Sequence, residues 1–352
     1  MVFDAHAHDG HEQVSFFSDP ASGLRSIVAV HDTSLGPGLG GTRILDYETE
    51  GDALHDVLRL SRAMTMKASA ADLDLGGAKA VIIGDPDEIK TEALLEAYGR
   101  SVDCLAGRYI TSVDVNSSVA DMEVIARETE HVVGRADALG DPSPITAAGV
   151  LAGIEACVEF EYGQRSLEDV AVAIQGLGKV GSTLAGDLAE RGASVTVTDV
   201  NDEKIERLVD EYGVEGVAPD EIYDVPCDVF APCAIGGVIN DETIPRLECD
   251  VVAGAANNIL AERRHAAVLA EHEISYAPDY VINAGGLITV AEEYRGGTRE
   301  AAFSKAEAIG PRLTEMMERA EDEGTTVLAA ADEYASERID ATDVSTPARF
   351  HD

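Results

Sequence analysis

Two lysines twelve residues apart are the residues of this chain best suited to acid–base chemistry. Lys67 ends the segment 64–67 (MTMK), and Lys79 ends the segment 75–79 (LGGAK), in a chain that has only six lysines among its 26 basic residues. An ammonium group can bind a carboxylate as a point charge and, unlike a guanidinium group, can lose its proton when it is desolvated. One lysine could therefore anchor an acidic substrate while the other acts as a base. The alternative is a pair of ordinary surface lysines.

Composition predicts a globular protein with two domains, since 352 residues are many for a single core and 45% of them are hydrophobic. The chain shows no apolar run of the ~20 residues that cross a bilayer. Its first residues have neither the basic nor the apolar region of a signal peptide. We therefore expect a cytoplasmic protein.

The balance of charges is strongly acidic, with a formal net charge of −40. Such a surface repels nucleic acids and anionic membranes, which are bound through lysine and arginine. The acidic residues are dispersed along the chain and form no tail. Our hypothesis is adaptation to a salty cytosol, because molar salt shortens the Debye length to ~3 Å and screens the self-repulsion.

The cysteines predict neither disulfides nor a metal site. The chain has five, an odd number, and none forms a Cys-x-x-Cys pair. Buried free thiols in a reducing compartment are the expected state. We therefore expect no bound metal.

The order of elements predicts an α/β fold with two domains. In the first domain we expect strands, helices and one glycine-rich turn (strands 26–30, 80–83 and 108–114; helices 50–70 and 88–104; turn 36–41). Two prolines in the segment 141–144 and a helical pattern from about 145 mark the boundary. The predicted domains are 1–140 with the C-terminal tail from about 326 to 352, and 141–325.

The second domain repeats strand and helix in a regular rhythm. Short β-rich segments occur at 170–174, 194–198, 228–230, 250–253 and 274–276, and helical segments lie between several of them. This pattern predicts a parallel, doubly wound sheet of the Rossmann type. After about residue 287 the chain is expected to be mostly helical.

A dinucleotide motif follows the first of these strands. Gly176, Gly178 and Gly181 match G-x-G-x-x-G between a strand and a helix, with Val180 inside the motif. The three glycines would make the tight turn, admit a pyrophosphate and bring the helix close to the strand. Asp199 ends the next strand, where an acid accepts hydrogen bonds from the ribose and disfavours a 2′-phosphate, so we predict NAD as the cofactor. The alternative is a structural glycine turn.

A cofactor domain after residue 140 leaves substrate binding and catalysis to the first domain. Oxidation of an amino acid gives an iminium that water must attack, and this step needs a base with a lowered pKa. Desolvation and neighbouring positive charge lower the pKa of a lysine. Asp114, at the end of the strand 108–114, could carry protons beside Lys67 and Lys79.

Seven segments together resemble the glutamate/leucine/phenylalanine/valine dehydrogenase family, over nearly the whole chain. They are 36–43 (GPGLGGTR), 64–67 (MTMK), 76–79 (GGAK), 112–115 (SVDV), 144–147 (PITA), 255–258 (AANN) and 282–286 (INAGG). The resemblance implies that Lys67 holds the substrate carboxylate, Lys79 activates water and Asp114 is the catalytic aspartate. It also implies nicotinamide contacts from Thr146 and Asn283, and a substrate site between two domains that close. The remaining substrate residues that it implies are Leu39, Gly40, Gly41, Met64, Ser112, Asn257, Asn258, Leu287 and Val290.

The glycine-rich segment bears on the choice of substrate. By resemblance, the family's glutamate enzymes carry a lysine where this chain has Leu39, and a glutamate carboxylate buried against leucine would cost several kcal/mol without a partner. We therefore predict a branched-chain or aliphatic L-amino acid (leucine, valine or isoleucine), which is converted to the 2-oxo acid and ammonia. Ser112, Val113 and Leu287 depart from the family's leucine enzymes, so the aliphatic substrates are not ranked. Phenylalanine and glutamate remain as alternatives.

Two other classes of function stay open. His6 and His8 form a His-x-His pair, as in metal-dependent amidohydrolases, although only two apolar residues precede them. A non-catalytic NAD-binding regulator is the second alternative. As partners we expect small molecules and copies of the same chain in a homo-oligomer, and neither nucleic acid nor membrane.

Overall fold

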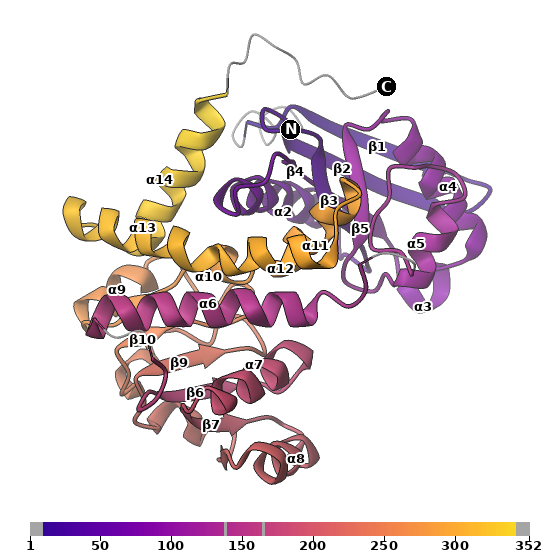
Figure 1. The fold of residues 1–352 in the computed structure, drawn as a ribbon. Helices are drawn as coiled ribbons and strands as arrows, with labels where there is room; N and C mark the ends of the chain where they lie inside the picture. The colour runs from indigo at the N-terminus through magenta and orange to yellow at the C-terminus, as the bar shows by residue number, and fades with distance from the viewer. Residues whose placement is uncertain (1–9, 137–138, 164–165, 343–352) are drawn as a thin grey trace. The chain divides into compact units, whose positions relative to one another are not determined.

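The computed structural model describes residues 10–136, 139–163 and 166–342 of the chain (Figure 1). The chain divides into two compact units. Unit 1 comprises Met1–Gly140, Val290–Gly297 and Ala335–Asp352, and unit 2 comprises Asp141–Thr289 and Thr298–Tyr334. Each unit has its own sheet and its own hydrophobic core.

Unit 1 is built on a five-stranded mixed sheet. In order across the sheet, the strands are β1 (Gln13–Asp19), β2 (Leu24–Asp32), β4 (Gly76–Ile83), β3 (Gly38–Leu45) and β5 (Tyr109–Val113). β3 runs parallel to both β4 and β5, whereas β2 is antiparallel to β1 and to β4. The carboxyl end of β5 therefore lies beside the middle of β3.

Helices cover both faces of this sheet because apolar residues alternate along its strands. α2 (Glu50–Ala70) packs on one face, where Ile27, Ala29 and Val81 meet its Val57 and Leu58. α4 (Glu92–Asp103) and α5 (Val119–Ile125) contribute to the core on the other face, which contains Ala78, Ala80 and Ile82. The strands thus divide their side chains between two helical layers.

Three local predictions for unit 1 need correction. Of the predicted turn 36–41, only Gly36 and Pro37 bend; β3 begins at Gly38, and the later glycines serve close strand contacts. The predicted helix 88–104 is two helices, α3 (Pro86–Ile89) and α4, because Thr91 caps the second one through the Leu94 N–H (3.3 Å). β1 was missed in the sequence, because polar and apolar residues do not alternate strictly along Gln13–Asp19 (QVSFFSD).

The C-terminal helix α14 (Val327–Asp340) contributes to both units, so the tail joins unit 1 at Ala335 and not at about 326. Its first half carries Leu328, which belongs to a core cluster of unit 2. In its second half, the Ala335 carbonyl accepts a hydrogen bond from Ser69 Oγ (2.7 Å), and Arg338 pairs with Asp72 (3.0 Å). The prediction also missed Val290–Gly297 as a member of unit 1. This segment comprises the second part of α11 (Gly285–Tyr294) and the three residues after it.

Unit 2 contains a six-stranded parallel sheet. In order across it, the strands are β11 (Ser275–Tyr276), β10 (Val251–Val252), β9 (Val229–Pro232), β6 (Ala171–Gln175), β7 (Ser194–Thr198) and β8 (Glu215–Gly216). Numbered from β6 as the first strand, this order is 3-2-1-4-5-6, the doubly wound arrangement of dinucleotide-binding folds. The predicted α/β fold with a Rossmann-like domain is confirmed.

Seven α-helices among the described residues belong wholly to unit 2. They are α6 (Ser143–Tyr162), α7 (Lys179–Glu190), α8 (Asp202–Tyr212), α9 (His265–Glu271), α10 (Asp279–Ile282), α12 (Arg299–Glu307) and α13 (Ile309–Glu323), with two 3-10 turns, Glu221–Asp224 and Ile244–Arg246, and the first part of α11. α6 is long and apolar enough to cross a membrane, which corrects the statement that no such run exists. Most of this helix is buried against α7, α12 and α13, as in the core helix of a globular unit.

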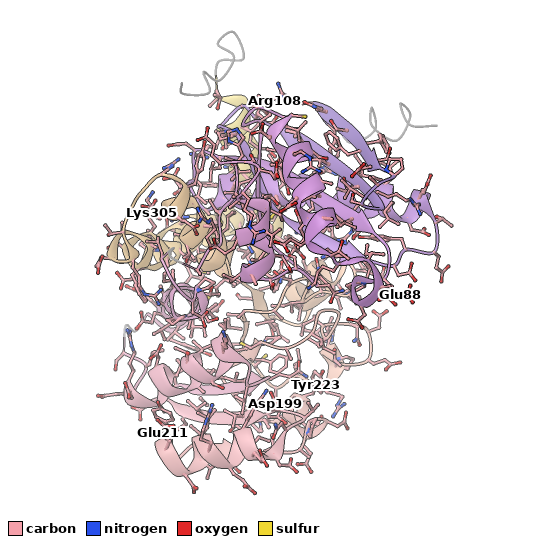
Figure 2. All side chains as sticks on the ribbon, turned by 90° about the vertical axis from the view of Figure 1, so that its right-hand side faces the viewer. Glu88, Arg108, Asp199, Glu211, Tyr223 and Lys305 are labelled. Atoms are coloured by element: carbon pink, nitrogen blue, oxygen red, sulfur yellow. The ribbon has the colours of Figure 1, made fainter. Side chains whose placement is uncertain are left out.

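Acidic side chains lie on the outside of both units. Figure 2 shows Glu88 of unit 1 and Glu211 of unit 2 pointing outward, and both are exposed. The five cysteines are free thiols. Only Cys157 and Cys249 are buried as predicted, whereas Cys227 and Cys233 are partly buried and Cys104 is exposed. The acidic surface is thus a property of both units.

Candidate active site

The predicted catalytic residues of unit 1 share one face of the sheet. Leu39, Gly41 and Arg43 alternate along β3 on the face that α2 covers, while Thr42 belongs to the hydroxyl network of the opposite face. By the same alternation, Lys79 on β4 and the residues at the end of β5 lie on the α2 face. Because side chains alternate between the two faces of a sheet, these residues of the three parallel strands lie on the same face.

Glycines allow the close contacts on which this site depends. A Cβ atom at Gly41 would lie 2.5 Å from the Val113 carbonyl oxygen and 2.8 Å from Asp114 Cβ. A Cβ at Gly77 would lie 2.1 Å from the backbone nitrogen of Thr65 on α2. Without side chains at these positions, the chain at Asp114 can approach β3, and α2 can approach β4.

Lys79 and Asp114 form an ion pair. Lys79 Nζ donates to Asp114 Oδ2, and only 6% of Lys79 is exposed. The other carboxylate oxygen of Asp114 accepts the N–H of Val115 (2.6 Å), and the Asp114 N–H donates to Ser117 Oγ (2.8 Å). The loop after β5 thus fixes the carboxylate against the ammonium group.

The surroundings of Lys79 favour its neutral form. Burial is the largest cause and the charge of Arg43 the next, and together with Lys67 and Arg59 they lower the pKa of Lys79 to about 7, although Asp56 opposes the shift. The carboxylate of Asp114 also opposes it, since a neighbouring negative charge stabilises an ammonium group. A lysine with this pKa can act as a base near neutral pH.

A second ion cluster adjoins this pair, and no role was predicted for its residues from the sequence. Arg43 Nη1 lies 2.9 Å from Asp56 Oδ2, and Arg43 Nε lies 3.5 Å from Asp114 Oδ1. Asp56 also accepts Tyr47 OH (2.8 Å) and pairs with Arg59 (2.9 Å). The alternation of Leu39, Gly41 and Arg43 could have placed Arg43 on the face of Lys79, but the α2 partners needed the tertiary structure.

The predicted substrate residues of unit 1 have different environments. Lys67 and Met64 are half-buried on α2, and Ser112 is buried directly across from Gly41 in the β3–β5 register. Only 1% of Leu39 is exposed, so this side chain is packed inside the unit. Gly40 is equally constrained, because a Cβ there would lie 1.7 Å from the Ala78 carbonyl oxygen. Their contacts with a substrate remain predictions.

In unit 2 the glycine turn between β6 and α7 has the properties of a dinucleotide site. Gly176 has a φ of 99°, a conformation that favours glycine, and a Cβ at Gly181 would lie 2.0 Å from the Gly176 carbonyl oxygen. A Cβ at Gly178 would meet nothing within 4 Å, and no side chain caps the start of α7 at this residue. The second glycine therefore faces open space at a helix N-terminus, where backbone N–H groups can bind phosphate.

Asp199 is held at the end of β7 by the glycine turn itself. Its carboxylate accepts the N–H of Leu177 (2.7 Å) and of Asn201 (3.0 Å), and Lys204 Nζ lies 3.3 Å away. Burial alone would raise the pKa of Asp199, but these three donors outweigh it and keep the pKa below its usual value. Figure 2 shows Asp199 in unit 2. The acid is thus fixed and ionised beside the turn.

The other predicted residues of unit 2 form a second group. Asn283 Nδ2 donates to Asn257 Oδ1 (3.0 Å) and to the carbonyl oxygens of Ala255 and Ala256 (3.2 Å each). A Cβ at Gly285 would lie 2.5 Å from Thr146 Cα, so this segment runs close to α6. Of the other predicted residues, Val180 lies on α7 and Leu287 lies on α11. Asn258 has a left-handed backbone conformation, with a φ of 51°.

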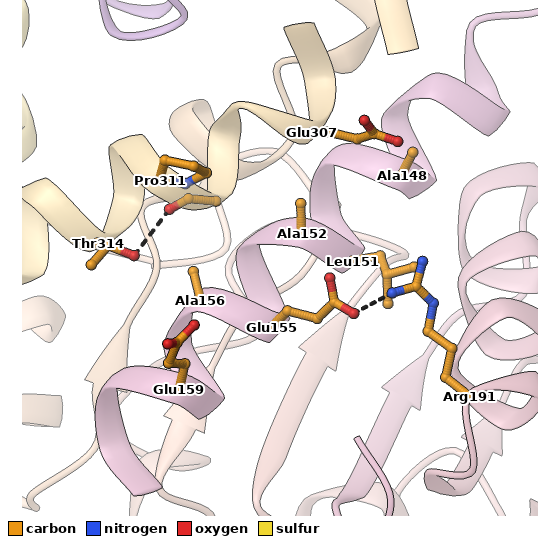
Figure 3. A pocket seen from close by; sticks show the side chains of 11 residues that line it. Ala148, Leu151, Ala152, Glu155, Ala156, Glu159, Arg191, Glu307, Pro311 and Thr314 are labelled. Carbon is orange, nitrogen blue, oxygen red and sulfur yellow. Dashed lines mark hydrogen bonds and ion pairs between the residues drawn. The ribbon is translucent and has the colours of Figure 1, made fainter. Parts of the chain in front are cut away.

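A hollow of about 370 Å³ elsewhere in unit 2 does not suit a dinucleotide (Figure 3). It lies among α6, α12 and α13, and its charged residues are Glu155, Glu159, Glu307 and Arg191. Arg191 is paired with Glu155, which leaves a surplus of carboxylates that would repel phosphate. No group of His, Cys, Asp or Glu within 10–136, 139–163 and 166–342 could hold a metal ion, and the His6–His8 pair lies outside the described residues.

Two family models match this chain. The model described as Glu/Leu/Phe/Val dehydrogenase, dimerisation domain, matches residues 11–131, and the model described as Glutamate/Leucine/Phenylalanine/Valine dehydrogenase matches residues 196–346. The chain belongs to the Glu/Leu/Phe/Val dehydrogenase family. Membership makes it an amino-acid dehydrogenase, and therefore an oxidoreductase, in a class different from the amidohydrolases.

Relatives within the Glu/Leu/Phe/Val dehydrogenase family act on different amino acids. A leucine dehydrogenase of Thermoactinomyces intermedius is 49% identical over 342 residues, which cover 96% of this chain and 93% of the relative. A phenylalanine dehydrogenase of Caldalkalibacillus thermarum is 46% identical over 337 residues, which cover 94% of this chain and 91% of the relative. The crystal structure of an L-tryptophan dehydrogenase from Nostoc punctiforme has a TM-score of 0.90 and 44% identity, and the match covers 97% of this chain and 99% of that one. The family is thus shown, and the side chain of the substrate is not fixed by similarity.

Proposed function

We propose that this amino-acid dehydrogenase catalyses the reversible, NAD-dependent oxidative deamination of an aliphatic L-amino acid such as leucine, valine or isoleucine. The buried Lys79–Asp114 pair carries the proposal, because a lysine whose pKa is lowered to about 7 can deliver a hydroxide equivalent to an iminium carbon. A non-catalytic NAD-binding regulator would have no need for such a pair.

In the proposed mechanism Lys67 binds the substrate carboxylate through its positive charge. The glycine turn at Gly176, Gly178 and Gly181 would hold NAD, which would supply the hydride acceptor needed to oxidise the substrate amine to an iminium ion. Neutral Lys79 removes a proton from a water molecule as that water adds to the iminium carbon. Asp114 takes a proton from the substrate ammonium group before hydride transfer and returns it to the amino group of the resulting carbinolamine. The carbinolamine hydroxyl then loses its proton to Asp114 as the C–N bond breaks, which releases ammonia and the 2-oxo acid.

The proposed preference for an aliphatic side chain rests on two residues. Leu39 offers no charge to a side-chain carboxylate, and its burial makes an uncompensated charge there costly by several kcal/mol. Leu287 is larger than the valine that the family's leucine enzymes tend to carry, so the site should be smaller at this point. Phenylalanine is the second candidate, because a phenylalanine dehydrogenase is 46% identical to this chain.

The choice of NAD over NADP is proposed from Asp199. A fixed, ionised carboxylate can accept hydrogen bonds from both ribose hydroxyls and repels a 2′-phosphate. Replacing it with glycine removes that repulsion, so Asp199→Gly should weaken the preference for NAD. The ratio of kcat/KM for NAD to that for NADP measures this effect, and an unchanged ratio would remove Asp199 from cofactor selection.

We further propose that the protein acts in the cytoplasm as a homo-oligomer. The match of residues 11–131 to a dimerisation domain supports self-association through unit 1. Light scattering at several salt concentrations measures the mass of the assembly, and a monomer at every concentration would contradict the proposal.

A substrate panel tests the proposed function. The purified protein is assayed for NADH formation with leucine, valine, isoleucine, phenylalanine, tryptophan and glutamate, at low and at molar KCl. The highest kcat/KM is expected with one of the three aliphatic substrates. A maximum with an aromatic amino acid would move the assignment within the family, and no oxidation of any amino acid would refute it.

A further inference from the structure

Arg43 contacts both the catalytic carboxylate and a second, supporting carboxylate. Its Nη1 lies 2.9 Å from Asp56 Oδ2, and its Nε lies 3.5 Å from Asp114 Oδ1. Only 21% of its side chain is exposed, against 15% for each of the two aspartates. In a site this enclosed, ion pairs are screened less than on the surface.

The support behind Arg43 is itself fixed. Asp56 accepts the hydroxyl of Tyr47 (2.8 Å) and pairs through its other oxygen with Arg59 (2.9 Å). Burial would raise the pKa of Asp56, but the Tyr47 hydroxyl and the two guanidinium groups outweigh burial and hold the pKa below its usual value. Asp56 therefore stays ionised and holds one end of the Arg43 guanidinium group in place.

The other end of Arg43 is poised toward the reaction. Among the described residues, the buried Nε of Arg43 has no hydrogen-bond partner, although Asp114 Oδ1 is 3.5 Å away. Contacts between catalytic groups are often long in an unliganded enzyme and shorten when the substrate binds. A small shift of the Asp114 carboxylate would complete this hydrogen bond.

We propose that Arg43 is a positioning residue for the reaction: anchored by Asp56, it orients the Asp114 carboxylate toward Lys79 and holds a fixed positive charge beside that lysine. This inference rests on the proposed roles of Lys79 and Asp114 and adds a residue to which none of those roles was assigned. It explains why the site has a guanidinium group here. Arg43 faces Asp56 through Nη1 and Asp114 through Nε, and this fixed spacing of donors is not available to the single nitrogen of a lysine.

The charge of Arg43 acts on Lys79 among a defined set of neighbours. Arg43 on β3 and Lys67 and Arg59 on α2 favour the neutral amine, whereas Asp56 on α2 and Asp114 after β5 favour the ammonium form. Burial is the largest cause of the lowered pKa, and Arg43 is the largest among the charges that lower it. Removing Arg43 should therefore raise the pKa of Lys79.

Arg43→Gln and Arg59→Gln form a matched pair of variants. Both remove one guanidinium group from Asp56, but only Arg43 reaches Asp114. With Arg43→Gln, the acidic limb of kcat/KM for amino-acid oxidation should move up by about two pH units, by Coulomb's law at an effective dielectric constant near 20. With Arg59→Gln the shift should be clearly smaller. Equal shifts, or none with Arg43→Gln, would overturn the proposal.

Arg43→Lys separates charge from geometry. This variant keeps the positive charge but loses the fork, so the acidic limb should stay near its wild-type pH while kcat falls about tenfold or more. A wild-type kcat would show that the two contacts of Arg43 are not needed for positioning. If Arg43→Gln does not fold, the kcat and pH profile of Arg43→Lys still test whether the two contacts of Arg43 position the Asp114 carboxylate.

The pKa of Lys79 can also be followed without any activity. Competitive acetylation of the lysines over a pH series, read by mass spectrometry, gives the titration of each amine. Arg43→Gln should move the midpoint of Lys79 upward, with the acetylation of Lys204 in unit 2 as the control; an unmoved Lys79 refutes the electrostatic role. If the wild type oxidises no amino acid, the proposed function fails, whereas the acetylation result still measures the effect of Arg43.

Discussion

At the scale of single residues, the environment of Lys79 destabilises the charged form of its side chain. Lys79 is almost fully buried and lies among other positive charges, so its neutral form is accessible near neutral pH. The ion pair with Asp114 prevents the pKa from falling further. Both properties together make Lys79 suitable for accepting and returning a proton.

Replacing this base should affect chemistry and spare the cofactor. Lys79→Ala is expected to lower kcat at least 100-fold, since a positioned general base contributes about 10²–10⁴ in rate. NADH binding, measured by fluorescence titration, should stay within about twofold. Lys90→Ala, which removes an exposed lysine that pairs with Asp121 (3.2 Å), is the control and should retain activity. Wild-type turnover in Lys79→Ala would exclude Lys79 from the mechanism.

The pKa of Lys79 also predicts a pH profile. Oxidation requires the neutral amine, so kcat/KM should rise with pH through about 7 and then level off. The rate falls at low pH because, below this pKa, the ammonium form of Lys79 predominates and cannot accept a proton. Initial rates at constant salt between pH 5.5 and about 9 measure the limb. A kcat/KM that still rises without levelling off at pH 9, as expected for a lysine with its usual pKa of about 10.4, would show that burial does not activate this residue.

At the scale of elements, glycines determine how closely the strands and helices approach. Gly41 allows Asp114 to lie close to β3, Gly77 allows α2 to pack close to β4, and Gly181 allows α7 to pack close to the end of β6. In each case a Cβ atom would lie within 2.5 Å of a backbone atom, which no small adjustment relieves. Gly178 is the exception, because the space beside it is open.

This difference predicts opposite behaviour for two glycines of one motif. Gly178→Ala should leave the melting temperature within a few degrees and weaken NADH binding about tenfold, because the added methyl group enters only the space proposed for phosphate. Gly181→Ala should destabilise the fold by several kcal/mol, because the Gly176 carbonyl oxygen stands 2.0 Å from the new Cβ. Calorimetry and fluorescence titration separate the two effects. Unchanged NADH binding in Gly178→Ala would place the phosphates elsewhere.

At the scale of the whole molecule, charge is the dominant property. The formal net charge of −40 on 352 residues produces a self-repulsion that opposes the folded state in dilute buffer. Many of the ion pairs are exposed and contribute little each. We propose that the fold depends on salt to screen this repulsion.

Thermal unfolding at increasing KCl tests this dependence. The melting temperature should rise by ten degrees or more between dilute buffer and molar KCl, as the Debye length falls to about 3 Å. Sucrose at matched osmolality is the control, because it favours burial without screening charge. An equal gain in sucrose, or no loss of stability in dilute buffer, would contradict the role of charge.

The sequence by itself determined the features that depend on short-range pattern. The alternation of β-rich and helical segments predicted the α/β class, and the spacing of Gly176, Gly178 and Gly181 after a strand predicted the dinucleotide turn. The segments around Lys67, Lys79 and Asp114 indicated the family. These signals are local because each depends on residues within one strand–turn–helix unit.

Only the tertiary structure decided which distant residues share an environment. It showed that the glycine-rich segment is a strand, since the partners that require its glycines lie on β4 and β5, far along the chain. It placed Asp56 of α2 behind Arg43 of β3, and the burial of Lys79 that lowers its pKa depends on the sheet and α2 together. Packing and electrostatics act through space, so the chemical state of Lys79 follows from the fold and not from its neighbours in sequence.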